Sequence, residues 1–136
     1  MKILSTVIIL IWSASVLFSG TIVGSFRAEP GFNRVLLKWT SEKEINLKGF
    51  EIERSFENRA STFRRIDFLA VSLALQDKKE YEYEDKTVFK SGDRTFYYRL
   101  KIVDEDGSST HSDVVAVSPN ISSTRHTWGS IKAMFR

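Results

Sequence analysis

The chain has 136 residues, of which 42% are hydrophobic, 27% charged and 12% aromatic. This length suits one domain, and the apolar fraction is high enough to exclude a wholly disordered chain. Cysteine is absent and only two histidines, His111 and His126, are present, which excludes disulfides, thiolate metal sites and cysteine nucleophiles. We therefore predict no cofactor and no metal site.

The net charge of +3 arises from 20 Lys and Arg residues against 17 Asp and Glu residues. One of the basic residues lies in 1–19 and three lie in 114–136, two stretches without acids, which leaves 16 basic against 17 acidic residues between them. The basic pI of about 9.2 therefore comes from the two ends of the chain. Because a nucleic-acid-binding domain carries its basic excess on the folded body, we expect no nucleic-acid partner.

The N-terminus consists of Lys2 followed by a long uncharged apolar run that ends near Gly20. One positive charge before an apolar run is typical of a secretory signal peptide, and the small residues at its end suit cleavage. We therefore predict a signal helix over residues 1–20 and export of the protein to the cell surface or periplasm. An uncleaved anchor is the alternative, because residues 3–24 are long enough to cross a bilayer.

Between residues 21 and 119, apolar residues mostly alternate with polar ones, and turn residues recur about every ten positions, as expected for short strands. A shift of parity between Phe63 and Ile66 indicates a bulge. The Asp104–Gly107 segment predicts a hairpin turn, because its Asp-Gly step suits a tight reversal. The pattern predicts an all-β, seven-stranded, antiparallel immunoglobulin-like sandwich over residues 21–119. The seven predicted strands are Thr21–Ala28, Arg34–Thr40, Phe50–Arg54, Phe63–Val71, Tyr81–Asp85, Thr95–Val103 and Asp113–Ser118.

The alternation also predicts which side chains face inward. The expected core residues are Val35, Leu37, Trp39, Phe50, Ile52, Phe63, Ile66, Tyr83, Phe96, Tyr98, Leu100, Ile102 and Val115.

Three of these segments resemble a fibronectin type III domain, of the kind found in secreted and surface proteins of Bacteroidetes and related bacteria. The matching segments are Val35–Thr40, Gly49–Ser55 and Tyr97–Asp104 with the following Asp106-Gly107, and the resemblance covers about residues 24–118. It implies that Trp39 is the core tryptophan of the second strand. The family's corner tyrosine aligns with Phe96, so the resemblance implies that its hydroxyl hydrogen bond is absent here.

The strands and turns show no spacing typical of a catalytic or metal site. Glu51, Glu53 and other glutamates alternate with apolar residues, which predicts that they lie on outward faces. A calcium-binding EF-hand loop that begins at Asp104 would need glutamate at position 115, where the chain has valine. His111 follows several hydroxyl residues, but neighbouring strand residues point to opposite faces, so we interpret it as a surface residue. We therefore predict that the protein is not an enzyme.

Residues 120–136 form a basic C-terminal tail in which the strand pattern stops. Its apolar residues fall at helical spacing with cations beside them, which favours docking on a partner or on an anionic membrane surface. Two alternatives are that the tail packs on the sandwich or frays. The candidate docking residues are Trp128, Ile131, Lys132, Met134, Phe135 and Arg136.

Together these observations predict a secreted, non-catalytic interaction or structural module at the cell envelope or surface. The tail would be its docking or sorting element, and membrane contact would involve only the N-terminal segment or the tail. One alternative is a subunit of an extracellular filament that self-assembles through a terminal segment. A second is a carbohydrate-binding module, for which Tyr81, Tyr97 and Trp128 are the candidate aromatic platform.

Overall fold

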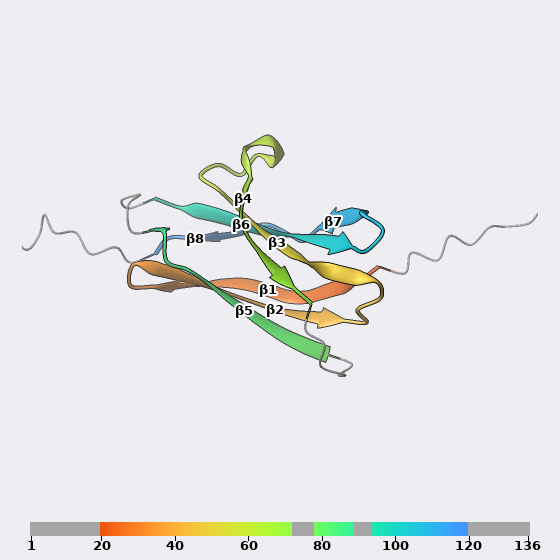
Figure 1. The fold of residues 1–136 in the computed structure, drawn as a ribbon. Coiled ribbons are helices and arrows are strands. Elements are labelled where there is room, and N and C mark those ends of the chain that lie inside the picture. Colours follow the sequence, from red (N-terminus) through yellow and green to blue (C-terminus); the bar gives the residue numbers. More distant parts are fainter. Residues whose placement is uncertain (1–19, 72–77, 89–93, 120–136) are drawn as a thin grey trace, which may run out of the picture.

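The computed structural model describes residues 20–71, 78–88 and 94–119, which form two antiparallel β-sheets that face each other (Figure 1). The smaller sheet has the order β1-β2-β5, and the larger has the order β4-β3-β6-β7, with β8 also paired to β6. This arrangement confirms the predicted all-β sandwich. The elements are β1 (Ile22–Gly31), β2 (Arg34–Glu42), β3 (Leu47–Ser55), the 3₁₀ helix η1 (Ala60–Thr62), β4 (Arg64–Ala70), β5 (Lys78–Asp85), β6 (Phe96–Asp104), β7 (Ser109–His111) and β8 (Val115–Val117).

The described residues contain eight strands instead of the predicted seven, because β7 (Ser109–His111), which lies outside the predicted strands, forms a separate part of the same edge as β8. Strands β7 and β8 both pair with β6, and Ser112 lies between them. The backbone N–H of Ser112 donates to the carbonyl of Leu100 (2.9 Å), and the N–H of Leu100 donates to the hydroxyl of Ser112 (2.9 Å). A side chain thus replaces a backbone acceptor, which ends the regular ladder without leaving the Leu100 amide unpaired.

The predicted bulge lies in β4. The register between β3 and β4 changes from Ile52 opposite Asp67 to Glu53 opposite Arg65, so Ile66 is the extra residue. A bulge of this kind places one additional side chain on one strand and increases its twist. The change of parity that the sequence shows is therefore a real irregularity of this edge strand.

Strand β1 extends three residues beyond the predicted end at Ala28 and ends at Gly31. Pro30 pairs with Val35 of β2, and an edge strand such as β1 is where a sheet tolerates proline. The reversal follows at Asn33, whose φ of 55° lies in the left-handed region.

The core lies between the sheets and is centred on three aromatic rings from both of them. Trp39 contacts Phe50 edge-on with centroids 5.4 Å apart, and Tyr81 stacks on Trp39 at 5.6 Å. Of the expected core residues, Ile66, Tyr83 and Val115 are only partly buried, and Phe63 is buried outside this cluster. The buried core is Val35, Leu37, Trp39, Leu47, Phe50, Ile52, Tyr81, Val88, Phe96, Tyr98, Leu100, Ile102 and Val117.

Candidate functional site

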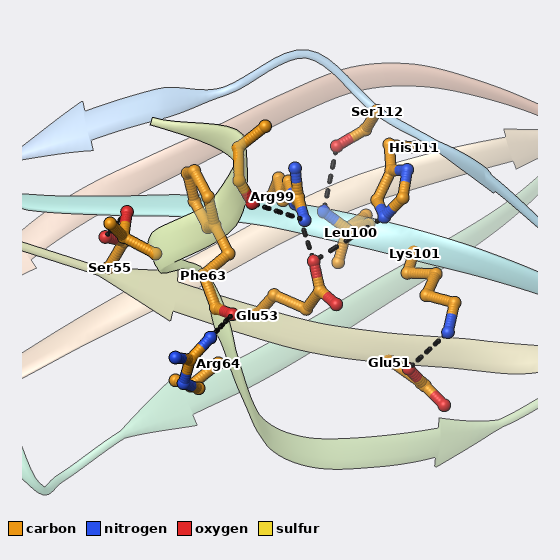
Figure 2. Close-up of polar contacts among 12 residues, drawn as sticks. Glu51, Glu53, Ser55, Phe63, Arg64, Arg99, Leu100, Lys101, His111 and Ser112 are labelled. Atoms are coloured by element: carbon orange, nitrogen blue, oxygen red, sulfur yellow. Dashed lines mark hydrogen bonds and ion pairs between the residues drawn. The ribbon is translucent and has the colours of Figure 1, made fainter. Parts of the chain in front are cut away.

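The outer face of the larger sheet carries a row of opposite charges (Figure 2). Alternation in β3 directs Phe50 and Ile52 inward and therefore places Glu51 and Glu53 on the opposite face. The register sets Glu53 beside Arg99 and Glu51 beside Lys101 of β6. The nitrogen-to-oxygen distances are 2.5 Å for Arg99–Glu53 and 3.2 Å for Lys101–Glu51. Cross-strand pairs of this kind stabilise a sheet face.

The Arg99–Glu53 pair is covered by an aromatic ring. The guanidinium of Arg99 lies 4.3 Å from the ring centre of Phe63, which comes from the loop before β4. Figure 2 shows this ring beside Arg99 and the carboxylate of Glu53 between Arg99 and His111. Nε2 of His111 lies 3.6 Å from Glu53 Oε2. Glu53 therefore lies on the outward face, as predicted, but this cover leaves it only 8% exposed.

A second buried carboxylate, Asp85, lies at the end of β5 and joins the two sheets. Its Oδ2 receives hydrogen bonds from Arg54 Nη1 (2.6 Å) and from the Tyr98 hydroxyl (2.8 Å). Thr87 donates to Oδ1 through its backbone N–H and its hydroxyl. Burial alone would raise the pKa of Asp85, but the Thr87 and Tyr98 hydrogen bonds and the Arg54 charge hold it below its usual value.

The hydrogen bond between Tyr98 and Asp85 lies close to Phe96, the residue that aligns with the corner tyrosine in the family resemblance. Phe96 has no hydroxyl and is fully buried, as that resemblance implies. Two residues further along β6, however, Tyr98 supplies a hydroxyl that reaches the end of β5. Burial and the Asp85 charge raise the pKa of Tyr98, so it remains a neutral donor.

A third carboxylate, Glu44, closes the loop between β2 and β3. It pairs with Lys79 Nζ at 2.5 Å and accepts hydrogen bonds from the hydroxyls of Tyr81 (2.6 Å) and Ser41. Burial would raise the pKa of Glu44, but the hydrogen bonds from Lys79, Ser41 and Tyr81 lower it. The buried carboxylates of Glu53 and Asp85 and the partly buried one of Glu44 are therefore all compensated by donors of the same domain.

The structure tests several of the predicted site residues. Tyr81 is stacked on Trp39 and only 8% exposed, so it cannot be part of an exposed aromatic platform, whereas Tyr97 is partly exposed. The Asp104–Gly107 turn forms as predicted, with Gly107 at a φ of 86° and its N–H donating to the carbonyl of Asp104.

The Asp106 carboxylate in that turn accepts hydrogen bonds from the hydroxyl and backbone N–H of Ser108. Across residues 20–71, 78–88 and 94–119, no three potential ligands gather as a metal site. Within the same residues, no helix has the length and apolar character needed to cross a membrane.

The predicted signal segment, except Gly20, and the predicted docking tail lie outside the described residues. The structure therefore does not place the predicted docking residues relative to the charged face. These residues are Trp128, Ile131, Lys132, Met134, Phe135 and Arg136.

The sequence reasoning missed Asp85 and Glu53 as buried charges. Asp85 shares its parity with Tyr81 and Tyr83, so the alternation of β5 already placed it on the inward side. The sequence carries no comparable signal for Glu53. Its burial depends on the Phe63 ring, which comes from the loop before β4 and packs over its partner Arg99.

No protein-family model matches the chain. No curated protein matches it either. Among solved structures, it is similar to a DUF3823 family protein from Bacteroides ovatus, with a TM-score of 0.55 and 14% identity over 72% of this chain and 55% of that one. It is also similar to pectate lyase PelI from Erwinia chrysanthemi, with a TM-score of 0.54 and 17% identity over 74% of this chain and 28% of the lyase.

Pectate lyase Pel3 from Pectobacterium carotovorum gives a TM-score of 0.54 and 18% identity over 77% of this chain and 29% of the lyase. The chain thus spans less than a third of each lyase and just over half of the Bacteroides protein. At these identities the likeness concerns the β-sandwich fold alone.

Proposed function

We propose that the chain is a fibronectin type III-like sandwich that acts as a non-catalytic interaction module at the cell envelope or surface. The observation that carries this proposal is that its buried or partly buried carboxylates, Glu44, Glu53 and Asp85, are each paired with a cation of the same domain. Such a body suits a scaffold, because its charges stabilise the fold and are not left available for reaction.

The strand order supports the finer family assignment. Strand β4 pairs with β3 in the larger sheet, whereas in a constant-type immunoglobulin domain the fourth strand joins the sheet of the first two. The three segments that resemble fibronectin type III contribute to β2, β3 and β6. Trp39 is fully buried at the centre of the core, which agrees with the role that the resemblance implies for it.

One electrostatic feature and one structural comparison favour a non-catalytic body. The pKa values of Asp85 and Glu44 are lowered, so both groups remain ionised near neutral pH and are poor proton donors. The pectate lyases that the fold resembles are enzymes by name, but this chain spans only 28–29% of the two described above. Their activity gives no reason to assign lyase chemistry to this domain.

The tail is the proposed docking or sorting element, with the apolar side chains of Trp128 and Phe135 as the contact. The test compares cells that express the full chain with cells that express a Trp128→Ala/Phe135→Ala double variant. Membrane, periplasmic, surface and medium fractions are separated, and the intact mass of the protein is measured in each. Phe32→Ala is the matched control, because Phe32 is an aromatic residue of the body that is 67% exposed.

We expect the double variant to change fraction or to lose its partner, while the Phe32→Ala variant behaves like the native chain. An intact mass reduced by the first 15–20 residues would support a cleaved signal peptide. If both variants partition like the native chain, the tail is not the docking element. If every form remains in the cytoplasm at full mass, the proposal of a secreted module is wrong.

A filament subunit is the second candidate, and the placement of the chain ends favours it. Strand β1 begins at one end of the sandwich and β8 finishes at the other (Figure 1). This arrangement suits subunits that join end to end through a terminal segment. Sedimentation velocity distinguishes the two candidates, because a filament subunit should sediment as a polymer and a soluble module as a defined small species.

A further inference from the structure

A small pocket lies beside the hairpin that joins β3 to β4. It has a volume of about 290 Å³, and its walls include Arg54, Phe56, Thr62, Arg64 and Ile66. The exposed surface of this pocket is mainly apolar. We call it the hairpin pocket. The same hairpin borders the charged row on the outer face of the larger sheet, because Phe63, between the pocket residues Thr62 and Arg64, packs over Arg99.

The walls of the hairpin pocket are held by local hydrogen bonds. The hydroxyls of Ser55 and Thr62 are 2.7 Å apart, and the backbone N–H of Glu57 donates to the Ser55 hydroxyl. The Thr62 backbone N–H and hydroxyl both bond to the carbonyl of Arg59. A site that is ordered before binding loses little conformational entropy when a ligand arrives.

Phe56 projects from this rigid hairpin and is 49% exposed. Its ring centre lies 5.4 Å from that of the buried Phe96 and 5.6 Å from the guanidinium carbon of Arg94. An aromatic ring that is anchored on one side and exposed on the other is typical of the central contact of a binding site.

The charged residues that line the pocket are Arg54, Glu57 and Arg64, so the lining carries a net positive charge. Arg54 is neutralised by Asp85, and Glu57 is paired with Arg59. Within the described residues, Nη1 of Arg64 donates to the backbone carbonyls of Ser61 and Phe63, which orient its guanidinium. Among the carboxylates in the described part of the chain, none lies within ion-pair distance of Arg64 or Arg94.

We infer that the hairpin pocket binds an acidic segment of a partner protein. One aliphatic or aromatic side chain of that segment would pack against Phe56 and Ile66, and a neighbouring carboxylate would pair with Arg64. An arginine that retains free N–H donors next to an apolar wall matches this combination of groups. The inference rests on the proposed function and names the chemistry of its partner.

The hydrogen bonds of the pocket favour a peptide over a sugar. A sugar offers many hydroxyls and needs several polar partners from the protein. The two hydroxyls in the pocket, of Ser55 and Thr62, already bond to each other and to the hairpin backbone. What remains for a ligand is an apolar surface and a positive charge.

The test uses the full chain and a set of fluorescently labelled nine-residue peptides. Each peptide carries a single Leu, Ile or Phe between Asp or Glu residues, and fluorescence anisotropy measures binding. Two matched sets replace the apolar residue with Ser or the acids with Lys. Oligogalacturonate is a further probe, because it carries carboxylates on a sugar. The protein variants are Phe56→Ala and Arg64→Gln, and Phe32→Ala serves as the control.

We expect acidic peptides with an apolar centre to bind and both matched sets to bind at least about tenfold more weakly, a difference of about 1.4 kcal/mol. Phe56→Ala and Arg64→Gln should each weaken binding about tenfold, while Phe32→Ala leaves it unchanged. Because Phe56 and Arg64 are exposed, both variants should fold, which circular dichroism checks.

Three results would overturn the inference: no acidic peptide binds better than its matched controls, the pocket variants bind as tightly as the native chain, or only oligogalacturonate binds. None of these changes where the protein is found in the cell. Cell fractionation therefore tests the proposed function separately from this inference.

Discussion

At the scale of single residues, the charges that leave water are each met by several donors. Asp85 is 1% exposed, and three side chains and one backbone amide bond to its two oxygens. An unpaired carboxylate in this position would lose most of its hydration without replacement. The Arg54 charge is stabilised as well, because its guanidinium pairs with Asp85 and lies over the ring of Phe96. The contact fixes the end of β5 against β3 and β6.

Replacement of Asp85 by asparagine should therefore destabilise the fold strongly. Removal of the negative charge leaves Arg54 partly buried without its counter-ion, and loss of one member of a buried pair costs about 3–5 kcal/mol. Urea titration would measure the change in the free energy of unfolding. Glu57→Gln is the control, because its pair with Arg59 is exposed and should contribute less than about 1 kcal/mol. Equal effects of the two substitutions would contradict this prediction.

The same residues predict how stability depends on pH. The pKa values of Asp85 and Glu44 lie below their ordinary values of 3.8 and 4.5 in the folded state. As the pH falls, the unfolded chain therefore takes up these protons first, so their stabilisation is present above about pH 4.5 and is lost below it. Thermal melts between pH 7 and pH 2.5 should show a falling midpoint on the acid side. An Asp85→Asn/Glu44→Gln variant should lose part of that slope.

At the scale of elements, every edge of the two sheets is interrupted or charged. Strand β1 has a register shift after Gly24, and Ile66 forms the bulge of β4. Ser112 divides the edge formed by β7 and β8. The remaining edge, β5, is rich in lysine and glutamate. These features are the means by which β-proteins avoid edge-to-edge association, so a filament of this protein would need a terminal segment to join its subunits.

The division at Ser112 can be tested directly. In a Ser112→Ala variant the buried Leu100 amide loses its acceptor, which should cost about 1–2 kcal/mol. Hydrogen exchange monitored by NMR should show faster exchange at Leu100 than in the native protein. Ser61→Ala, a change in the exposed η1, is the control. An unchanged Leu100 amide would mean that the hydroxyl is not its essential acceptor.

At the scale of the whole molecule, one core serves both sheets. The rings of Trp39 and Tyr81 come from the smaller sheet, and that of Phe50 comes from the larger. The Phe50 and Tyr81 ring centres are 5.0 Å apart. Arg54 and Asp85 add a polar link between the sheets. Neither sheet can therefore keep its inner face buried when the other unfolds.

The segment 20–119 should consequently fold without the predicted signal and tail and unfold in one cooperative step. It contains a single tryptophan, Trp39, whose fluorescence reports on the centre of the core. Urea unfolding followed by this fluorescence and by far-ultraviolet circular dichroism should give coincident curves. Separate midpoints would show that the two sheets unfold independently. Failure of the segment to fold would show that the domain needs residues beyond 20–119.

Local patterns in the sequence were sufficient for the fold class and most inward-facing residues, because the period of two in strands such as β2, β3 and β6 is a local property of the chain. They also predicted a bulge between Phe63 and Ile66 and the hairpin turn at Gly107. They could not place the docking tail, which remains a prediction. The hairpin pocket went unpredicted because Phe56 and Arg64 have no local pattern that marks them.

Tertiary contacts set the burial of those polar groups that strand alternation directs outward. Glu53 and Glu51 have the same pattern in the sequence, yet the Phe63 ring covers only the pair that Arg99 forms with Glu53. Tyr81 stacks on Trp39 because β5 pairs with β2, and the edge divides at Ser112 because its hydroxyl meets the Leu100 amide. Each of these outcomes depends on a contact between residues that are distant in the chain. Local alternation tells which face a side chain points to, but it does not specify which neighbour covers that side chain.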